Sequence, residues 1–336
     1  MVALRRPRAR SAEFPLGLSP RTIFVTGKGG VGKTTVAAAL ALAWRDAGVR
    51  TLLVELEGQA SAAACISTKT ISYQPQALRP NLHAMRIDRD SALREYAHIR
   101  LKVKMLSDRL VGNPIMSQFA EAAPGLPELL VLGKLWALAK LVDGRGRPRF
   151  EAIVVDAPAT GHGLGLLGMA GVVARMFPVG PISAEARQVD AFIRDAERVG
   201  AVLVALPEEM PVNETFDLAD QPKQQGVDVS TVLLNGLLPA RFTDDDIEHL
   251  EGLRQSRLDA ALDAALATAS YEHERRTSQL EEWSRLTTRF GDIATLPWIY
   301  TTELSRRDIE GFARWLTASG QTRLVREMAD LGAVTP

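Results

Sequence analysis

GKGGVGKTT, at residues 27–35, carries the pattern G-x-x-x-x-G-K-[ST] of a phosphate-binding loop. The run follows an apolar segment with strand character and opens a segment with helical character, which is the setting that the pattern requires. Glycines let backbone amides turn toward phosphate oxygens, and the start of a helix adds partial positive charge. Lys33 is expected to contact the β- and γ-phosphates, and the Thr34 hydroxyl to bind Mg²⁺. The residues expected to bind ATP are Gly29, Gly30, Val31, Gly32, Lys33, Thr34 and Thr35.

Short apolar runs recur along the chain and predict the strands of a sheet. They are continuously apolar, which is typical of parallel strands covered on both faces. Helical patterns separate them, so the sequence predicts an α/β fold with a doubly wound, mostly parallel sheet. The predicted strands are 22–26, 51–55, 82–87, 152–156, 201–206 and 231–235, with a weaker one at 293–297.

The predicted organisation is one large domain between two tails. A basic, disordered tail is expected at 1–19, a P-loop ATPase domain at 20–317 and a C-terminal tail at 318–336. A helical insertion is expected at about 89–145, because no convincing strand stands there. The helical stretch 243–290 opens on TDDD, whose acids are expected to cap the helix instead of binding a metal.

Composition excludes several classes of protein. The chain has 40 basic and 40 acidic side chains, so no global charge favours nucleic acid or an anionic membrane, and no nucleic-acid partner is expected. Its single cysteine, Cys65, excludes a disulfide framework within one chain. No run of about 18 apolar residues is present, so no transmembrane segment is expected. No signal-peptide pattern opens the chain, and a cytoplasmic location is expected.

A second motif stands at the end of the fourth predicted strand. Asp156 closes AIVVD and is expected to hold Mg²⁺ together with Thr34. It also opens DAPATGH, which resembles a switch motif of the arsenite-pump (ArsA) and tail-anchored-protein-targeting ATPases. GKGGVGKTT, with its extra lysine, resembles the deviant Walker A loop of the same family. PGLPELL (124–130), PEEMPVNET (207–215) and LLNGLLP (233–239) resemble further family segments, so the resemblance covers about residues 20–317.

The resemblance implies roles that the loop pattern alone does not give. Lys28 would act as a catalytic residue by crossing a homodimer interface to the partner's nucleotide; the alternative is a solvated surface lysine. Asn235 would bind the adenine edge, with Pro207 and Glu208 lining the base pocket. Asn235 could instead cap a strand end.

The first switch departs from the family. Glu57 stands where the family places a water-orienting aspartate, so it is a candidate catalytic residue, with a plain loop charge as the alternative. The LLVE-x-EG pattern resembles a bacterial branch. The paired zinc cysteines of the targeting factors and the arsenite thiols of ArsA are absent, and Cys65 is expected to be a small buried hydrophobe. Gly165 replaces a family arginine.

The resemblance implies an Mg-ATP-hydrolysing switch that acts on a client or a membrane-pump partner. A ParA- or MinD-like positioning ATPase and a slow ATP-binding chaperone are the alternatives. Apolar helical residues could form a groove for an apolar client, or an ordinary buried helix pair. They are Leu126, Leu129, Leu130, Leu132, Leu135, Trp136 and Leu138, with Met105, Met116, Met169 and Met176 nearby.

Overall fold

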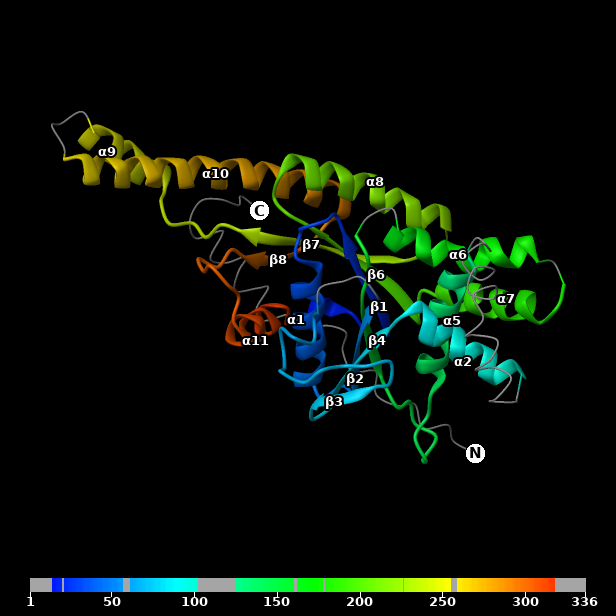
Figure 1. Ribbon diagram of the computed structural model, residues 1–336. Helices are drawn as coiled ribbons and strands as arrows, with labels where there is room; N and C mark the ends of the chain where they lie inside the picture. The colour runs from blue at the N-terminus through cyan, green and yellow to red at the C-terminus, as the bar shows by residue number, and fades with distance from the viewer. Residues whose placement is uncertain are drawn as a thin grey trace, which may run out of the picture.

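The computed structural model describes residues 14–19, 21–56, 61–101, 125–159, 162–177, 179–225, 227–254 and 259–317. They form a central sheet with helices on both faces (Figure 1). The order across the sheet is β3-β4-β2-β5-β1-β6-β7-β8, and each neighbouring pair is parallel except β3–β4. The predicted doubly wound α/β fold is therefore confirmed. The strands are β1 (Thr22–Gly27), β2 (Thr51–Leu56), β3 (Gln76–Arg79), β4 (Leu82–Ile87), β5 (Ala152–Asp156), β6 (Val199–Ala205), β7 (Val229–Leu237) and β8 (Ala294–Pro297).

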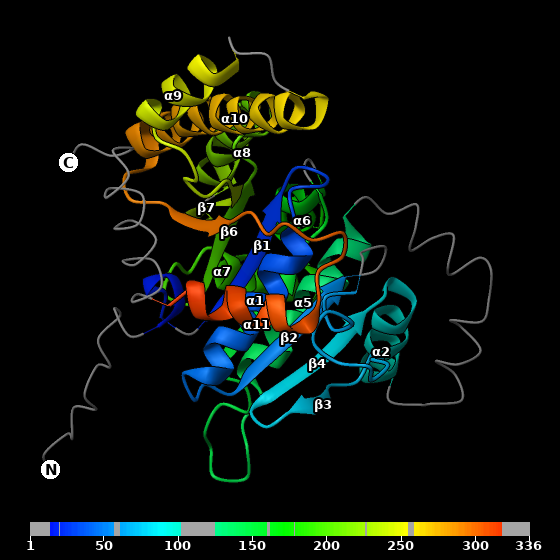
Figure 2. The same cartoon turned by 90° about the vertical axis from the view of Figure 1, so that its left-hand side faces the viewer.

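The helices fall on two sides of this sheet. In Figure 2, α1 and α11 lie in front of the strands, and each contacts the other. The opposite face carries α5, α6, α7, α8 and part of α10, whose apolar residues share one core with the strands. The bounds are α1 (Lys33–Asp46), α2 (Arg89–Leu101), α5 (Leu126–Lys140), α6 (His162–Met176), α7 (Pro181–Ile193), α8 (Glu209–Gln225), α9 (Asp244–Arg254), α10 (Ala260–Phe290) and α11 (Arg306–Trp315).

The strand and helix patterns follow from this double cover. Every residue of β1, β2, β5 and β6 is buried, which is why these strands are mainly apolar, with Glu55 and Asp156 as the charged exceptions. Helix α1 is buried from Val36 to Trp44 because the sheet covers one side of it and α11 the other. A helix in that position needs no polar stripe.

The sequence did not predict β3. Its four residues form an antiparallel edge and are only partly buried, so they show no apolar run. Pro80 and Asn81 join β3 to β4, and Asn81 adopts φ 59°. Asparagine tolerates this left-handed conformation, which makes the tight reversal accessible.

The predicted helical insertion begins with α2 and ends near α5. Residues 102–124, including Met105 and Met116, lie outside the described residues. Helix α5 buries most of its leucines in the same core as β2 and β5, as an ordinary buried helix would. Only the Leu126 and Trp136 side chains of the predicted groove are partly exposed on this helix.

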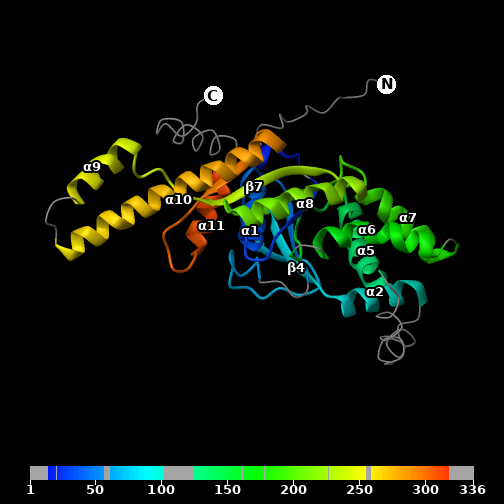
Figure 3. The same cartoon turned by 90° about the horizontal axis from the view of Figure 1, so that it is seen from above.

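Helices α9 and α10 extend from the body of the molecule as an antiparallel pair (Figure 3). The predicted cap is present at the start of α9, where Thr243 Oγ1 accepts from the Asp246 amide at 3.1 Å and the Asp246 carboxylate accepts from the Thr243 amide at 2.9 Å. Within the described part of the chain, no helix is long and apolar enough to cross a membrane.

The first described residues pack against the last described helix. Pro15–Gly17 form a 3₁₀ turn, and the Leu16 amide donates to the Leu316 carbonyl at 2.8 Å. Leu18 is buried in the core of the α1 face. Packed structure therefore begins before residue 20, the boundary expected from the sequence. Residues 1–13 and 318–336 lie outside the described chain.

Candidate active site

Close backbone approaches around the loop at 27–35 require glycine at two positions. At Gly27 (φ 151°), an added Cβ would stand 2.2 Å from the Val204 carbonyl oxygen on β6. At Gly32 (φ 87°), it would stand 2.3 Å from Nδ2 of Asn235. Residues with a side chain rarely adopt these φ values. Both positions therefore require glycine, because of the backbone conformation and because no room is left for a Cβ. The loop is thus held between the ends of β1, β6 and β7.

Lys33 is the first residue of α1 and is buried. Its ammonium donates to the Lys28 carbonyl at 2.8 Å, across the loop. Burial lowers the pKa of Lys33, and the negative charge of Asp156 partly opposes that shift. A neutral carbonyl is a weaker partner for an ammonium than a phosphate oxygen. The lysine is therefore held where an anion in the loop would attract it.

Thr34 and Asp156 meet beneath the loop. The Thr34 hydroxyl donates to Asp156 Oδ2 at 2.9 Å. Asp156 is the last residue of β5, next to β1, and is fully buried. Burial raises its pKa to about 6, against the hydrogen bond from Thr34 and the charge of Lys33, with Glu55 adding to the rise.

This pair has the donors that Mg²⁺ needs. Asp156 Oδ1 is buried and finds no hydrogen-bond partner among the described residues. Carboxylate and hydroxyl oxygens are hard ligands, and Mg²⁺ is bound through one or two of them together with phosphate oxygens. The described residues contain no group of three or more His, Cys, Asp or Glu side chains that could hold a metal without a substrate. The residues present therefore fit a metal bound with a nucleotide.

Lys28, the first lysine of the loop, forms an ion pair with a residue far along the chain. Its Nζ lies 3.0 Å from Oε1 of Glu214 on α8, and about a third of each side chain is exposed. Glu214 Oε2 is buried and has no hydrogen-bond partner within the described chain. Lys28 is thus at the surface but is held by its own chain.

The residues predicted for the base pocket stand at the ends of β6 and β7. Asn235 donates from Nδ2 to the Val31 carbonyl at 2.9 Å, so it contacts the loop directly. Pro207 is buried and Glu208 is exposed, just after β6. The structure brings these residues to one edge of the sheet. Their contact with adenine stays a prediction.

Glu57 and Gly58–Ala60 lie outside the described residues, so the proposed catalytic carboxylate stays a prediction. Cys65 is half-buried, and burial together with the charges of Asp156 and Glu55 raises its thiol pKa. Such a thiol is a poor nucleophile and metal ligand. The prediction of a small buried hydrophobe is thus met only in part, because the side chain is half-buried.

Sequence reasoning missed two residues of this region. Glu55, in the apolar run LLVEL, is fully buried and binds Arg86 of β4. The sequence did carry a sign of this residue, because an acidic side chain is unusual inside a strand that is expected to be buried on both faces. Glu214, the partner of Lys28, lies in the segment 207–215, and its pairing needed the fold to bring α8 beside the loop.

Comparison with known proteins places these features in one family. The family model described as anion-transporting ATPase matches residues 20–183 and 179–263. The chain is 32% identical over 256 residues to ATPase BagA of Mycobacterium tuberculosis, covering 74% of each chain. It is 29% identical over 239 residues to an arsenical pump-driving ATPase of Escherichia coli, covering 66% of this chain and 40% of the relative. A similar protein of Acidiphilium multivorum is 29% identical over 247 residues, and 41% of it is covered.

The family match spans β1, the loop at 27–35 and α1, as well as the buried Asp156 and the end of β7. The glycines that the backbone requires, the buried lysine and the hydroxyl–carboxylate pair are the groups that ATP hydrolysis uses. The chain belongs to the anion-transporting ATPase family and is an ATPase.

Proposed function

We propose that this ATPase uses Mg-ATP, closes as a homodimer when ATP is bound and opens after hydrolysis, and that this cycle acts on a client. The observation that carries the Mg-ATP assignment is the Thr34–Asp156 pair, in which one buried carboxylate oxygen finds no partner among the described residues. A buried polar atom without a partner costs roughly 1–3 kcal/mol, so its place at a phosphate-binding loop supports a ligand there.

Each residue of the proposed site would have a separate chemical role. Lys33 would exchange its bond to the Lys28 carbonyl for one to a phosphate oxygen. Thr34 and Asp156 would hold Mg²⁺, which neutralises phosphate charge. Glu57 would accept a proton or a hydrogen bond from the attacking water.

The homodimer proposal rests on Lys28. The ion pair with Glu214 is about one-third exposed, so both side chains can be reached by a second molecule. The chain has one phosphate-binding loop, and a cation supplied by another copy would stabilise charge that builds on the transferring phosphoryl group. In the monomer, Lys28 must leave Glu214 before it can do so.

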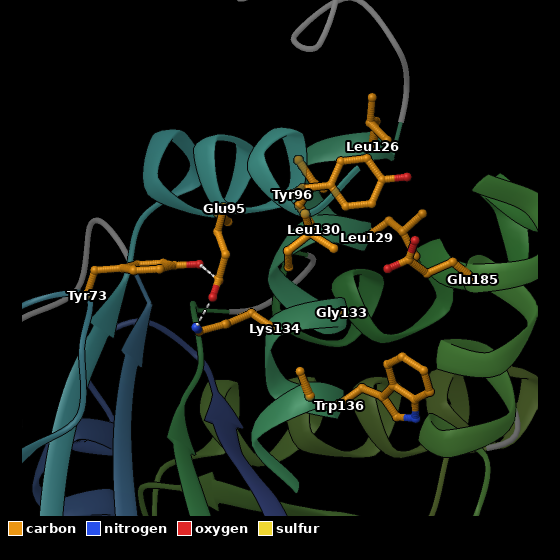
Figure 4. Close-up of a pocket in the computed structure, with 13 residues that line it drawn as sticks. Tyr73, Glu95, Tyr96, Leu126, Leu129, Leu130, Gly133, Lys134, Trp136 and Glu185 are labelled. Carbon is orange, nitrogen blue, oxygen red and sulfur yellow. Dashed lines mark hydrogen bonds and ion pairs between the residues drawn. The ribbon is translucent and has the colours of Figure 1, made fainter. Parts of the chain in front are cut away.

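A cavity of about 250 Å³ between α2 and α5 supports an apolar partner segment. Figure 4 shows Tyr96, Trp136 and Leu130 around it, while Tyr73 and Lys134 both point to Glu95 at one end. Lys134 Nζ lies 2.7 Å from a Glu95 carboxylate oxygen, so this polar end is internally paired. The client therefore remains a proposal, defined only by its apolar surface.

Lys33→Ala is expected to abolish ATP binding and hydrolysis, because the phosphate charge loses its fixed cation. The matched control is Lys69→Ala, since Lys69 also donates to a backbone carbonyl at 2.8 Å but lies on an exposed loop. Calorimetry and steady-state turnover measure both properties. Tight ATP binding by Lys33→Ala would contradict the assignment. Binding without turnover in the wild type would favour the chaperone, and co-sedimentation with vesicles or DNA the positioning ATPase.

A further inference from the structure

Glu55 is a buried carboxylate with an unusually complete set of donors. It stands one residue before the end of β2, and its side chain has no exposed surface. Oε1 accepts from the Ser61 hydroxyl at 2.9 Å and from the Ala63 amide at 2.7 Å. Oε2 accepts from Nη2 of Arg86 at 2.8 Å and from Nε at 3.2 Å. Both oxygens are therefore occupied by the protein itself.

The position of Glu55 in the sheet puts it beside the candidate metal ligand. The register pairs Glu55 with Asp156 on β5 and with Arg86 on β4. Residues paired in register on parallel strands direct their side chains to the same face. Glu55 thus lies one strand away from Asp156, at the carboxyl edge where ligands bind in such sheets.

The burial of this charge needs an explanation. An ionised carboxylate taken out of water costs several kcal/mol unless hydrogen bonds and an opposite charge compensate it. An apolar residue would fit the rest of LLVEL at no such cost. Two of the compensating hydrogen bonds come from Ser61 and Ala63, in the described segment that follows β2 in the chain.

We propose that Glu55 is a positioning residue of the ATPase, which fixes Ser61 and Ala63 to the sheet edge beside Asp156. One carboxylate then joins the end of β2 to the described segment that begins at Ser61. Glu55 contacts no substrate in this role, because its lone pairs are filled by Ser61, Ala63 and Arg86. The inference rests on the proposed Mg-ATP site, which it refines.

The test compares Glu55→Ala with Glu55→Gln in the full chain. Alanine removes the acceptor for Ser61 and Ala63, and we expect single-turnover hydrolysis at saturating Mg-ATP to slow by roughly 10- to 100-fold, the scale of a small misplacement at an active site. ATP affinity should stay within about threefold, since the phosphate-binding loop is untouched. Glutamine keeps a carbonyl acceptor, and Arg86, with 43% of its side chain exposed, can turn to water. Glu55→Gln should therefore retain most of the activity.

Two further readouts separate positioning from a purely structural role. Ser61→Ala should slow hydrolysis in the wild type but add nothing in the Glu55→Ala background, because the Ser61–Glu55 hydrogen bond is already lost there. The Ala63 amide should exchange with solvent faster in Glu55→Ala than in the wild type. The control is Glu151→Ala, which breaks the ion pair with Arg50 at the other end of β2 and β5 and should leave the rate unchanged.

A wild-type rate in folded Glu55→Ala would overturn the inference, and so would independent, multiplying losses from Ser61→Ala. Unchanged exchange at Ala63 would show that the anchor does not exist in solution. These failures are distinct from failure of the proposed function: an active Lys33→Ala variant would reject the site itself. An inactive Lys33→Ala variant with active Glu55→Ala would reject only the positioning role.

Discussion

The surroundings of Asp156 act on the pKa of its carboxyl group in opposite directions. Burial at the end of β5 favours its protonated form, whereas the Thr34 hydroxyl and the Lys33 ammonium favour the charged form. Burial dominates and raises the pKa to about 6, so the carboxylate is costly to keep ionised when no ligand is bound. A cation placed against its unpartnered oxygen would reverse that balance. The strain on this residue is thus of the kind that binding can relieve.

Asp156→Asn should stabilise the nucleotide-free protein at pH 7. An acid whose pKa is higher in the folded state contributes stability below its unfolded pKa and loses it as the pH rises through the folded pKa. A shift from 3.8 to about 6 corresponds to roughly 3 kcal/mol, lost between about pH 4 and pH 6. Thermal unfolding should show the variant above the wild type at pH 7 and equal to it near pH 4. If the variant and the wild type differed in unfolding temperature by the same amount at both pH values, the raised pKa of Asp156 would not be the cause.

Helix α8 and the phosphate-binding loop are joined by the pair between Lys28 and Glu214. The loop begins where β1 ends, and α8 follows β6, its neighbour in the sheet. Parallel strands place both segments at the same edge. Because α8 holds Lys28 through this ion pair, it can influence when Lys28 is available to another molecule.

Glu214→Gln is expected to favour ATP-driven dimerisation, because it weakens the contact that Lys28 must leave. Since the pair is partly exposed and worth at most about 1 kcal/mol, dimer affinity should rise by no more than about fivefold. Analytical ultracentrifugation with a slowly hydrolysed ATP analogue measures it. Glu209→Gln, on the first turn of the same helix, is the control. Weaker dimerisation in Glu214→Gln would mean that this carboxylate serves the closed state instead.

The sheet order determines how the whole molecule could use a second copy. The carboxyl ends of β2, β5, β1, β6 and β7 carry Glu55, Asp156, the phosphate-binding loop, Pro207 and Asn235 along one edge. In the proposed site, that edge carries the groups expected to bind phosphate and metal. A partner across it would need to add only the cation that Lys28 can provide, and a two-fold axis would make the exchange reciprocal.

Mixing Lys28→Ala with Asp156→Asn, each inactive alone, should restore activity if Lys28 acts across a dimer. One half-site of the mixed dimer then combines wild-type Asp156 with the partner's wild-type Lys28. Random pairing of equal amounts would give about one quarter of the wild-type rate. In the control, Lys28→Ala is mixed with the double variant Lys28→Ala/Asp156→Asn, which supplies no Lys28. No recovery in verified mixed dimers would place the action of Lys28 within its own chain.

The sequence by itself determined the parallel sheet and predicted the phosphate site. Continuous apolar runs identify strands covered on both faces, and the local spacing of GKGGVGKTT predicts a phosphate-binding strand–loop–helix unit. Asp156 is predicted as its metal ligand from its place at the end of another apolar run. The sequence did not predict the edge strand β3, because a partly exposed edge strand has no continuous apolar run. Only the tertiary structure decided the partners of Lys28 and Glu55. Glu214 and Arg86 are 186 and 31 residues away in sequence, and only strand order and register bring such charges together.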